Sequence, residues 1–178
     1  MIYAYTRIGE DVVVQFSDHP AAISGMNLHE VSGPVPAVGV GSSLRVVNGQ
    51  FVVEPPTLDW LRSTKKAEIN AAREKANSST FTHQGKEFQV DSNGWKDITA
   101  VGGHVGMFQS LPADFPGAWK ALDNTYFPIQ TVDAFKAFYA SMVAQGAHNF
   151  MRAQALKTLV DNCTTAEQIE SVNWQTPV

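Results

Sequence analysis

The side chains best suited to metal binding or acid–base chemistry are dispersed along this sequence. None of the histidines has a His, Cys or carboxylate partner at the spacing of a metal site. The five are His19, His29, His83, His104 and His148. A zinc site needs three or four ligands that converge on one ion. The sequence therefore favours ordinary structural roles for these histidines over a metal site.

Asp91, Asn93 and Asp97 invite comparison with a calcium-binding loop, because their oxygen atoms recur at short spacing. An EF-hand loop also needs a glycine at its sixth position and a bidentate glutamate at its twelfth. This stretch has neither. We therefore interpret Asp91 or Ser92 as the N-cap of a short helix, with Asp97 as an acid close to its start.

The glycine-rich stretch at residues 102–106 could be compared with a phosphate-binding loop. It lacks the Lys-Ser/Thr pair of such loops and has no clear strand before it, so it does not fit the pattern. Trp95, Ile98, Val101 and Val105 would share one face of a helix here. The glycines favour tight helix packing or a helix break, and they weigh against a regular helix over the whole stretch.

Nucleophilic catalysis finds no support in the sequence. Cys163 is the only cysteine and has no motif around it, so we expect a small buried apolar residue. Ser24 and Ser42 lack the strand–turn–helix context of a hydrolase serine. The carboxylates are spread along the chain, with no identifiable acid–base pair. We therefore expect no enzymatic activity and no bound metal or cofactor.

The aromatic residues could provide a platform on which sugars or bases stack. The chain has ten phenylalanines and four tryptophans, Trp60, Trp95, Trp119 and Trp174. Core packing accounts for most such residues in a globular protein. A binding platform is therefore the less favoured interpretation.

Composition narrows the class of protein further. The 178 residues carry a net charge of −4, with scattered lysines and arginines, which argues against nucleic-acid binding. The first sixteen residues lack the pattern of a signal peptide, and no apolar stretch is long enough to span a membrane. We expect a soluble protein of one ordinary domain or two small ones.

Residues 1–54 are predicted to form a small β module. Residues 2–6 and 11–16 alternate between apolar and other side chains, as strands do, and a turn separates them. Residues 28–31 resemble a further strand. Residues 44–47 and 51–53 flank Asn48-Gly49, the strongest short hairpin signal, because both turn residues accept a positive φ. A module of this size buries little by itself, so a docking surface would complete its core.

Residues 55–77 are predicted to form a connecting helix. Pro55-Pro56 ends the β module, and Thr57 can cap a helix that runs to about Asn77. This helix is polar on nearly all sides, which is typical of a bridge between domains or of a strand in a bundle between copies. Trp60, Leu61 and Ile69 are the residues that we expect to contribute to such assembly.

Residues 78–178 are predicted to form an α+β domain in which short hairpins pack on a long helix. One hairpin is expected at residues 81–90, turning at Gln84-Gly85, and another at residues 119–129. The long helix spans residues 131–162, with Thr131 as its N-cap and a left-handed Asn162 as its end. Gly146 interrupts and weakens it. A last short helix opens at the capping-box pattern of residues 164–167.

Four segments of the sequence resemble those of a known family. They are the helical segment KAEINAAREKA, the segment GKEFQVDSNGW, the hairpin around Asp123-Asn124 and the helical segment RAQALKTLVDNC. Residues 65–174 resemble a domain of unknown function that recurs in tailed-bacteriophage proteins, often tail-fibre proteins or products encoded beside them. The match is a pattern of aromatics, turns and helix phrases, and it holds no catalytic signature. The glycine-rich segment GGHVG departs from it.

The resemblance implies a bacteriophage structural protein found in the virion tail and made in the host bacterial cytoplasm. Its partners would be other tail or fibre proteins, with neither nucleic acid nor membrane insertion involved. A homo-oligomer, favoured as a trimer, is the companion expectation. Two alternatives remain: a chaperone for tail-fibre assembly, and a receptor- or glycan-binding tip that uses exposed aromatic residues.

Overall fold

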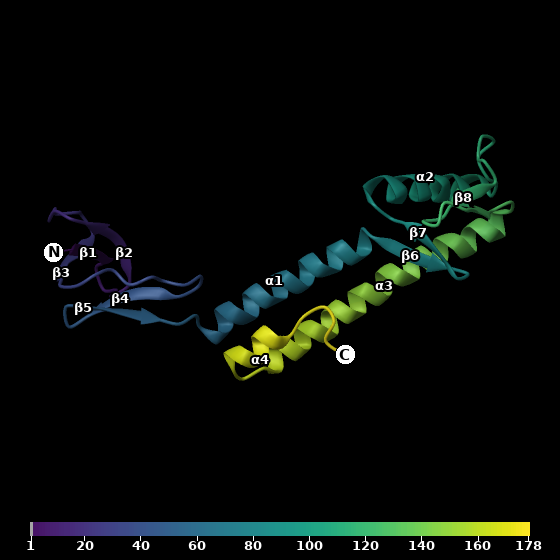
Figure 1. Ribbon diagram of the computed structural model, residues 1–178. Helices are drawn as coiled ribbons and strands as arrows, with labels where there is room; N and C mark the ends of the chain where they lie inside the picture. Colours follow the sequence, from purple (N-terminus) through teal and green to yellow (C-terminus); the bar gives the residue numbers. More distant parts are fainter. Residues whose placement is uncertain (1) are drawn as a thin grey trace. The chain divides into compact units, whose positions relative to one another are not determined.

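The computed structural model describes residues 2–178, and its helices and strands are labelled in Figure 1. Contacts between residues divide the chain into two compact units. Unit 1 comprises Met1–Thr64 with Thr164–Ala166, and unit 2 comprises Lys65–Cys163 with Glu167–Val178. Strands and helices occur in the mixture expected of an α+β protein. The predicted fold class is therefore confirmed.

Unit 1 contains an antiparallel sheet and a separate hairpin. The sheet has the strand order β2-β1-β3, formed by Ile2–Arg7 (β1), Val13–Ser17 (β2) and Met26–Val31 (β3). The hairpin pairs Ser43–Val47 (β4) with Gln50–Glu54 (β5). Asn48 and Gly49 form its turn with φ values of 52° and 73°, so the Asn-Gly prediction is confirmed.

The core of unit 1 is small. Ala4, Val31 and Val46 are buried together, with Val13 and Phe51 packed against them. The sheet and the hairpin thus meet through a few apolar side chains. So small a core provides only a small part of the hydrophobic stabilisation of a typical domain.

A charged group supplements that core. Arg45 donates through Nη1 to Glu54 (2.7 Å) and through Nε to Asp11 (2.7 Å). These hydrogen bonds raise the pKa of Arg45, and the bond from Arg45 lowers the pKa of Asp11. The guanidinium group therefore links the segment before β2 to both strands of the hairpin.

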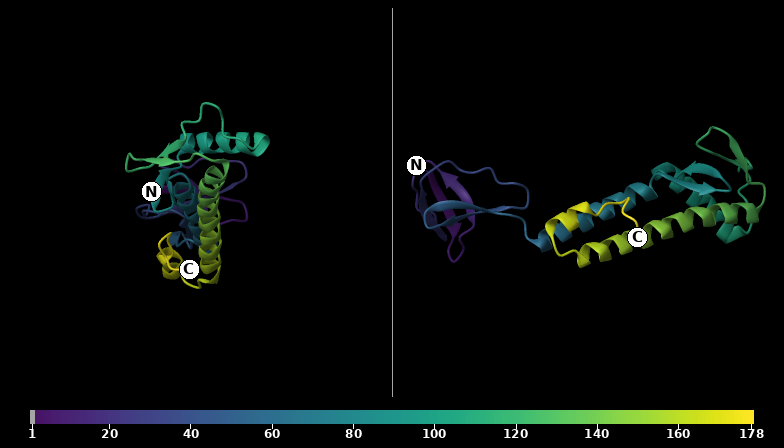
Figure 2. Two further views of the ribbon diagram at one scale, coloured as in Figure 1. Left: turned by 90° about the vertical axis from the view of Figure 1, so that its right-hand side faces the viewer. Right: turned by 60° about the horizontal axis from the view of Figure 1, so that its bottom comes forward.

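Helix α1 spans Leu58–Asn77 and begins as the sequence predicts, since the Thr57 hydroxyl accepts a hydrogen bond from the Trp60 N–H (3.2 Å). Its part within unit 2 runs alongside α3 (Val132–Asn162) in the opposite direction, as Figure 1 and the right-hand view of Figure 2 show. Lys66 pairs with Asp161, and the guanidinium of Arg73 lies 5.8 Å from the centre of the Phe150 ring. Polar residues of α1 thus contact α3 within this chain.

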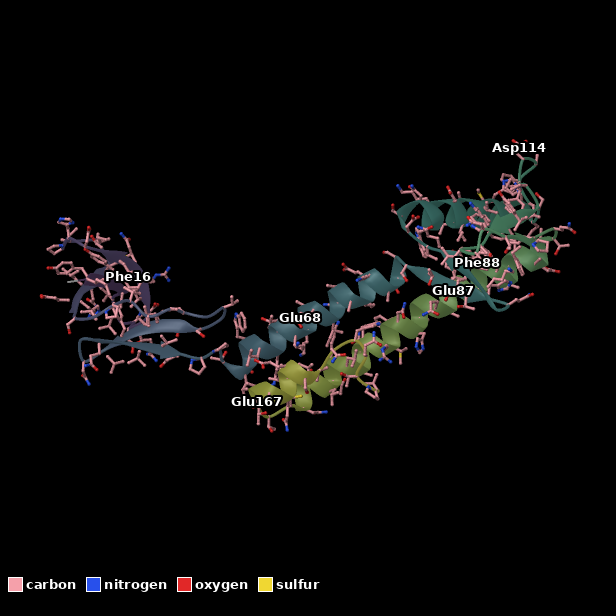
Figure 3. The ribbon with its side chains drawn as sticks, in the orientation of Figure 1. Phe16, Glu68, Glu87, Phe88, Asp114 and Glu167 are labelled. Atoms are coloured by element: carbon pink, nitrogen blue, oxygen red, sulfur yellow. The ribbon has the colours of Figure 1, made fainter. Side chains whose placement is uncertain are left out.

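Unit 2 is built on the N-terminal half of α3. Two hairpins pack there, formed by Thr80–His83 (β6) with Lys86–Gln89 (β7) and by Ala118–Lys120 (β8) with Tyr126–Pro128 (β9). The ring of Phe88 lies 4.9 Å from that of Phe138 and 5.4 Å from that of Phe81. Figure 3 shows Phe88 at the hairpin beside α3. Aromatic packing therefore forms the centre of this core.

Helix α2 spans Ser92–Phe108 without interruption. The prediction that its glycines break the helix is therefore wrong. A Cβ atom at Gly102 would lie 3.0 Å from the Tyr139 ring, so this glycine lets α2 approach α3 closely. Ile98 and Val105 are buried on the predicted face, whereas Trp95 is half-exposed. Tight helix packing was the correct alternative for Gly102.

Helix α3 is continuous through Gly146, and Thr131 caps it by accepting a hydrogen bond from the Ala134 N–H (3.1 Å). The predicted left-handed end is wrong, because Cys163 caps the helix in an extended conformation. Phe135, Phe138 and Leu156 are buried on this helix, whereas Val143 and Phe150 are exposed. The last helix, Ala166–Ser171 (α4), forms as predicted and buries Ile169.

Candidate functional site

A surface groove of about 690 Å³ lies within unit 2. Its lining residues fall within three stretches, 76–81, 90–96 and 142–149. The groove therefore lies between the end of α1, the outer ends of the β6–β7 hairpin, the first turn of α2 and the middle of α3. Its volume falls in the range of roughly 300–1,000 Å³ that is typical of small-molecule pockets.

Buried apolar side chains form the floor of this groove. Phe81, Val90 and Met142 line it and also belong to the core of unit 2. Alternation along β6 turns Phe81 and His83 inward and leaves Thr82 outside. The groove thus opens onto one edge of a well-packed core.

Two large apolar side chains line the same groove without being covered. Trp95 on α2 and Val143 on α3 are each 48% exposed. The other tryptophans contact their own chain: Trp119 packs on the Phe138 ring, and Trp174 lies beneath Arg152. Trp95 is accordingly the tryptophan best placed to receive a ligand.

A chain of three amides borders the groove. Gln145 donates to Asn149 Oδ1 (3.3 Å), and Asn149 donates to Asn77 Oδ1 (2.9 Å). Asn149 is only 4% exposed, and these bonds satisfy its buried amide. For residues 2–178, the structure assigns no further hydrogen bond to the Asn77 amino group or the Gln145 carbonyl. The Asn77 amino group and the Gln145 carbonyl are therefore available as one hydrogen-bond donor and one acceptor at the two ends of this row of amides.

The carboxylate of Asp91 accepts hydrogen bonds from groups close to it in the sequence. Its Oδ1 accepts from the N–H groups of Asn93 (3.1 Å) and Gly94 (2.8 Å), and its Oδ2 accepts from Gln89 (2.7 Å). The predicted N-cap is confirmed. Within residues 2–178, no three or more His, Cys, Asp or Glu side chains are placed to hold a metal ion.

Gly146 lines the groove and has open space beside it. A Cβ atom built on this residue would meet no atom within 4 Å, and its backbone does not have a positive φ. Neither close packing nor backbone conformation requires a glycine here. The residue costs the helix about 1 kcal/mol relative to alanine. Its clear structural consequence is an open groove.

The buried His83 and the partly buried Ser141 form a pair that superficially resembles a base and a nucleophile. His83 Nδ1 lies 2.8 Å from Ser141 Oγ, and that hydroxyl donates to the Ala137 carbonyl (3.2 Å). The serine hydroxyl thus has a backbone acceptor as well as the imidazole, an arrangement that fits a structural hydrogen bond. Burial between the Phe127 and Phe138 rings lowers the pKa of His83 and keeps it neutral.

The remaining candidate residues are not brought together. His29 lies 2.9 Å from the Thr6 hydroxyl in unit 1, while His104 stacks near Phe108 on α2. Cys163 is buried, as predicted, and its thiol donates to the Leu159 carbonyl (3.3 Å).

The predicted assembly residues occupy different environments. Ile69 is only 2% exposed, because its side chain is buried within its own chain, and its predicted role in assembly stays a prediction. Trp60 packs against Gly41, where an added Cβ would lie 2.5 Å from the indole ring. Trp60 is still 37% exposed, and Leu61 is partly buried. Their role in assembly stays a prediction.

Sequence reasoning missed the groove because its lining comes from segments far apart in the chain. Asn77, Gln145 and Asn149 carried no motif. Gly146 was the one available signal, since a glycine in the middle of a long amphipathic helix needs an explanation. It was interpreted only as a weak point.

The fold and the groove together define an α+β domain with a groove that has an apolar floor and is bordered by amides. Residues 61–173 match the model of a family described as Domain of unknown function (DUF4376), and the chain belongs to this family. The matched region runs from the first turns of α1 to the residues after α4. No curated protein matches this chain, and neither does any solved structure.

Among the described residues, none of the helices combines the length and the apolar character needed to cross a membrane.

Proposed function

We propose that this protein is a non-enzymatic structural component of a bacteriophage tail. It acts through protein–protein assembly as an adaptor or cap associated with a fibre or baseplate. The resemblance of residues 65–174 to a domain of tailed-phage proteins supports the phage setting. The exposed apolar surface of unit 1 is the observation that carries the assembly role.

Strand β3 offers an edge for pairing. Among residues 2–178 it pairs only with β1, so its other side is not part of a ladder. Leu28 on this strand is 44% exposed. An exposed strand edge with apolar side chains is a common site for adding a strand from a partner protein.

Apolar side chains are also exposed on the other strands of unit 1. Val14 and Phe16 of β2 are 46% and 42% exposed, and Val52 and Val53 of β5 are similarly uncovered. Figure 3 shows Phe16 on β2. Strands that face water on one side normally carry polar residues there. Several apolar side chains in so small a unit indicate a surface that a partner covers.

The partner in this proposal is another tail or fibre protein, and the place of action is the virion. Three-fold self-association, through Trp60 and Leu61 on α1, is part of the same proposal. Assembly of this kind needs no catalytic group. It is compatible with histidines and carboxylates that are used for structural hydrogen bonds.

Quantitative mass spectrometry of gradient-purified particles, compared with crude lysate, tests the tail role. The expected result is a fixed copy number per particle that is a multiple of three. A protein abundant in lysate but missing from particles would overturn the structural role and favour an assembly chaperone.

A matched pair of variants tests the β3 edge. Leu28→Lys should reduce incorporation into particles several-fold, because a charged edge residue opposes strand addition. Val40→Lys places the same charge on an exposed loop residue of unit 1 and should leave incorporation unchanged. Equal incorporation of both variants would exclude β3 as the docking edge.

A further inference from the structure

We propose that the groove of unit 2 binds a neutral oligosaccharide that carries 2-acetamido groups, with one sugar ring stacked on Trp95. The proposal concerns a ligand site in the family domain. It goes beyond the tail role and does not depend on it. Four features of the groove support it: open space beside Gly146, an exposed indole, amide ends of both kinds, and little net charge.

The open space beside Gly146 indicates a ligand site. A glycine inside a helix of 31 residues lowers helix stability, and no neighbouring atom requires the glycine at position 146. Gly146 lines the groove together with Trp95 and Asn149, so a larger side chain at position 146 would take up part of this space.

The indole and the amides indicate a sugar. A pyranose ring has an apolar face of C–H groups that can lie on an aromatic ring such as Trp95, while its hydroxyl groups both donate and accept hydrogen bonds. The amide chain offers a donor at Asn77 and an acceptor at Gln145. A groove that offers a hydrogen-bond donor and an acceptor matches a sugar, whose hydroxyl groups accept and donate hydrogen bonds.

The charges indicate that the ligand is neutral. Among residues 2–178, Lys96 and Asp91 are the charged residues that line the groove, and the Asp91 carboxylate already caps α2. Recognition of a phosphate or carboxylate normally uses arginine pairs or clustered cations. A lone exposed lysine does not provide such a site.

The apolar floor favours an acetamido group over a plain hexose. Phe81, Val90 and Met142 can cover a methyl group, while the N–H and C=O of the same acetamido substituent match the ends of the amide chain. A hexose without this substituent would place a hydroxyl on the apolar floor, and burying that hydroxyl without a partner is unfavourable.

Titration of the full-length ¹⁵N-labelled protein with chitotriose tests the proposal, with cellotriose as the matched probe that has the same linkage and no acetamido groups. Chitotriose should shift the Trp95 indole N–H signal and the backbone signals around Gly146 in a saturable manner. Cellotriose should bind at least about tenfold more weakly, a difference of about 1.4 kcal/mol.

Two variants of helical glycines provide the structural control. Gly146→Leu fills the groove and should abolish binding. Gly103→Leu adds the same side chain to α2, where space is also open but outside the groove, and should bind like the wild type. Circular dichroism and thermal unfolding check that both variants are folded. Trp95→Ala, a third variant, should weaken binding at least about tenfold, whereas Trp95→Phe should retain most of it.

Absence of saturable chitotriose binding would overturn the proposal, as would wild-type affinity in Gly146→Leu. Equal affinity for cellotriose would overturn the assignment of an acetamido sugar. These outcomes are independent of copy number in particles, so failure of the sugar site and failure of the tail role can be told apart.

Discussion

Gly94, Gly102 and Gly146 all lie in helices, yet the space around them differs. A Cβ at Gly94 would lie 2.7 Å from the Gln89 carbonyl oxygen, and a Cβ at Gly102 would lie 3.0 Å from the Tyr139 ring. A Cβ at Gly146 would meet nothing within 4 Å. Gly94 and Gly102 allow neighbouring segments to pack closely against the helix. Gly146 has no neighbour that close, so the space beside it stays open.

Gly146→Ala should stabilise the protein by about 1 kcal/mol, because alanine is the better helix former and its methyl group meets no neighbour. Gly94→Ala should destabilise it by about 1–3 kcal/mol, because the methyl group must displace backbone. Urea unfolding of both variants measures these changes. A destabilised Gly146→Ala would show that the space around this residue is smaller than the structure indicates.

His83 is a second residue whose environment has a measurable consequence. Its ring is buried against Phe127 and Phe138, and burial lowers its pKa below the ordinary value of 6.5. The unfolded chain therefore takes up a proton at a higher pH than the folded chain does. Folding stability is then fully present above pH 6.5 and decreases as the pH falls below it.

His83→Gln should be destabilised at neutral pH by about 1–3 kcal/mol, through lost packing and a disturbed bond to Ser141. Its stability should also decline less than that of the wild type as the pH falls below 6.5. Urea unfolding across this range measures both effects, with the exposed His148→Gln as control. A decline as steep as in the wild type would contradict the assignment to His83.

At the scale of elements, the two hairpins of unit 2 are joined by a polar contact at their ends. Lys86 of β7 donates to Asp123 (2.8 Å) and to Thr125 (2.7 Å) in the turn between β8 and β9. The Leu122 N–H also donates to the Glu87 carbonyl (2.9 Å). The hydrogen bond from Lys86 is the main cause that holds the pKa of Asp123 well below its usual range, and hydrogen bonds from Thr125 add to it.

The lowered pKa of Asp123 predicts a contribution to stability that is present above pH 3.8 and lost as the pH falls further through the folded-state value. Asp123→Asn should remove this contribution and flatten the acid limb of the stability curve. The carboxylate is exposed, so salt should weaken its effect. Acid unfolding at low and high ionic strength measures this, and an unchanged acid limb in the variant would count against it.

At the scale of the whole molecule, the two units differ in how much apolar surface they bury. One core cluster of unit 2 contains ten buried residues between Phe81 and Met142, with further aromatic residues packed against them. The buried apolar residues described in unit 1 are fewer: Ala4, Tyr5, Val31, Leu44 and Val46. Their abilities to fold alone should differ accordingly.

A fragment of residues 55–178 should keep its helical content and unfold cooperatively, because the core of unit 2 lies wholly within it. A fragment of residues 1–54 should be largely unfolded by itself, since so small a set of buried apolar residues cannot offset its conformational entropy. Circular dichroism melts of both fragments test this. A cooperative transition in the shorter fragment would contradict the expectation that this module needs a docking surface.

Local patterns allowed the elements to be predicted correctly. Asn48-Gly49, Thr57, Asp91 and Thr131 each act through their own backbone or the next turn, so their effect is readable without tertiary structure. Where a prediction failed, a distant segment was responsible. The glycines of α2 do not break it, and Gly102 is explained by its contact with Tyr139 of α3.

By itself, the sequence determined the α+β class, the hairpins and the helix starts, because each depends on interactions within a few residues. Only the tertiary structure decided which apolar residues are core and which are surface. Ile69 and Trp95 obey the same helical periodicity, yet one is buried and the other half-exposed. The groove likewise required three distant stretches to meet, and periodicity along one helix contains no information about what packs beside it.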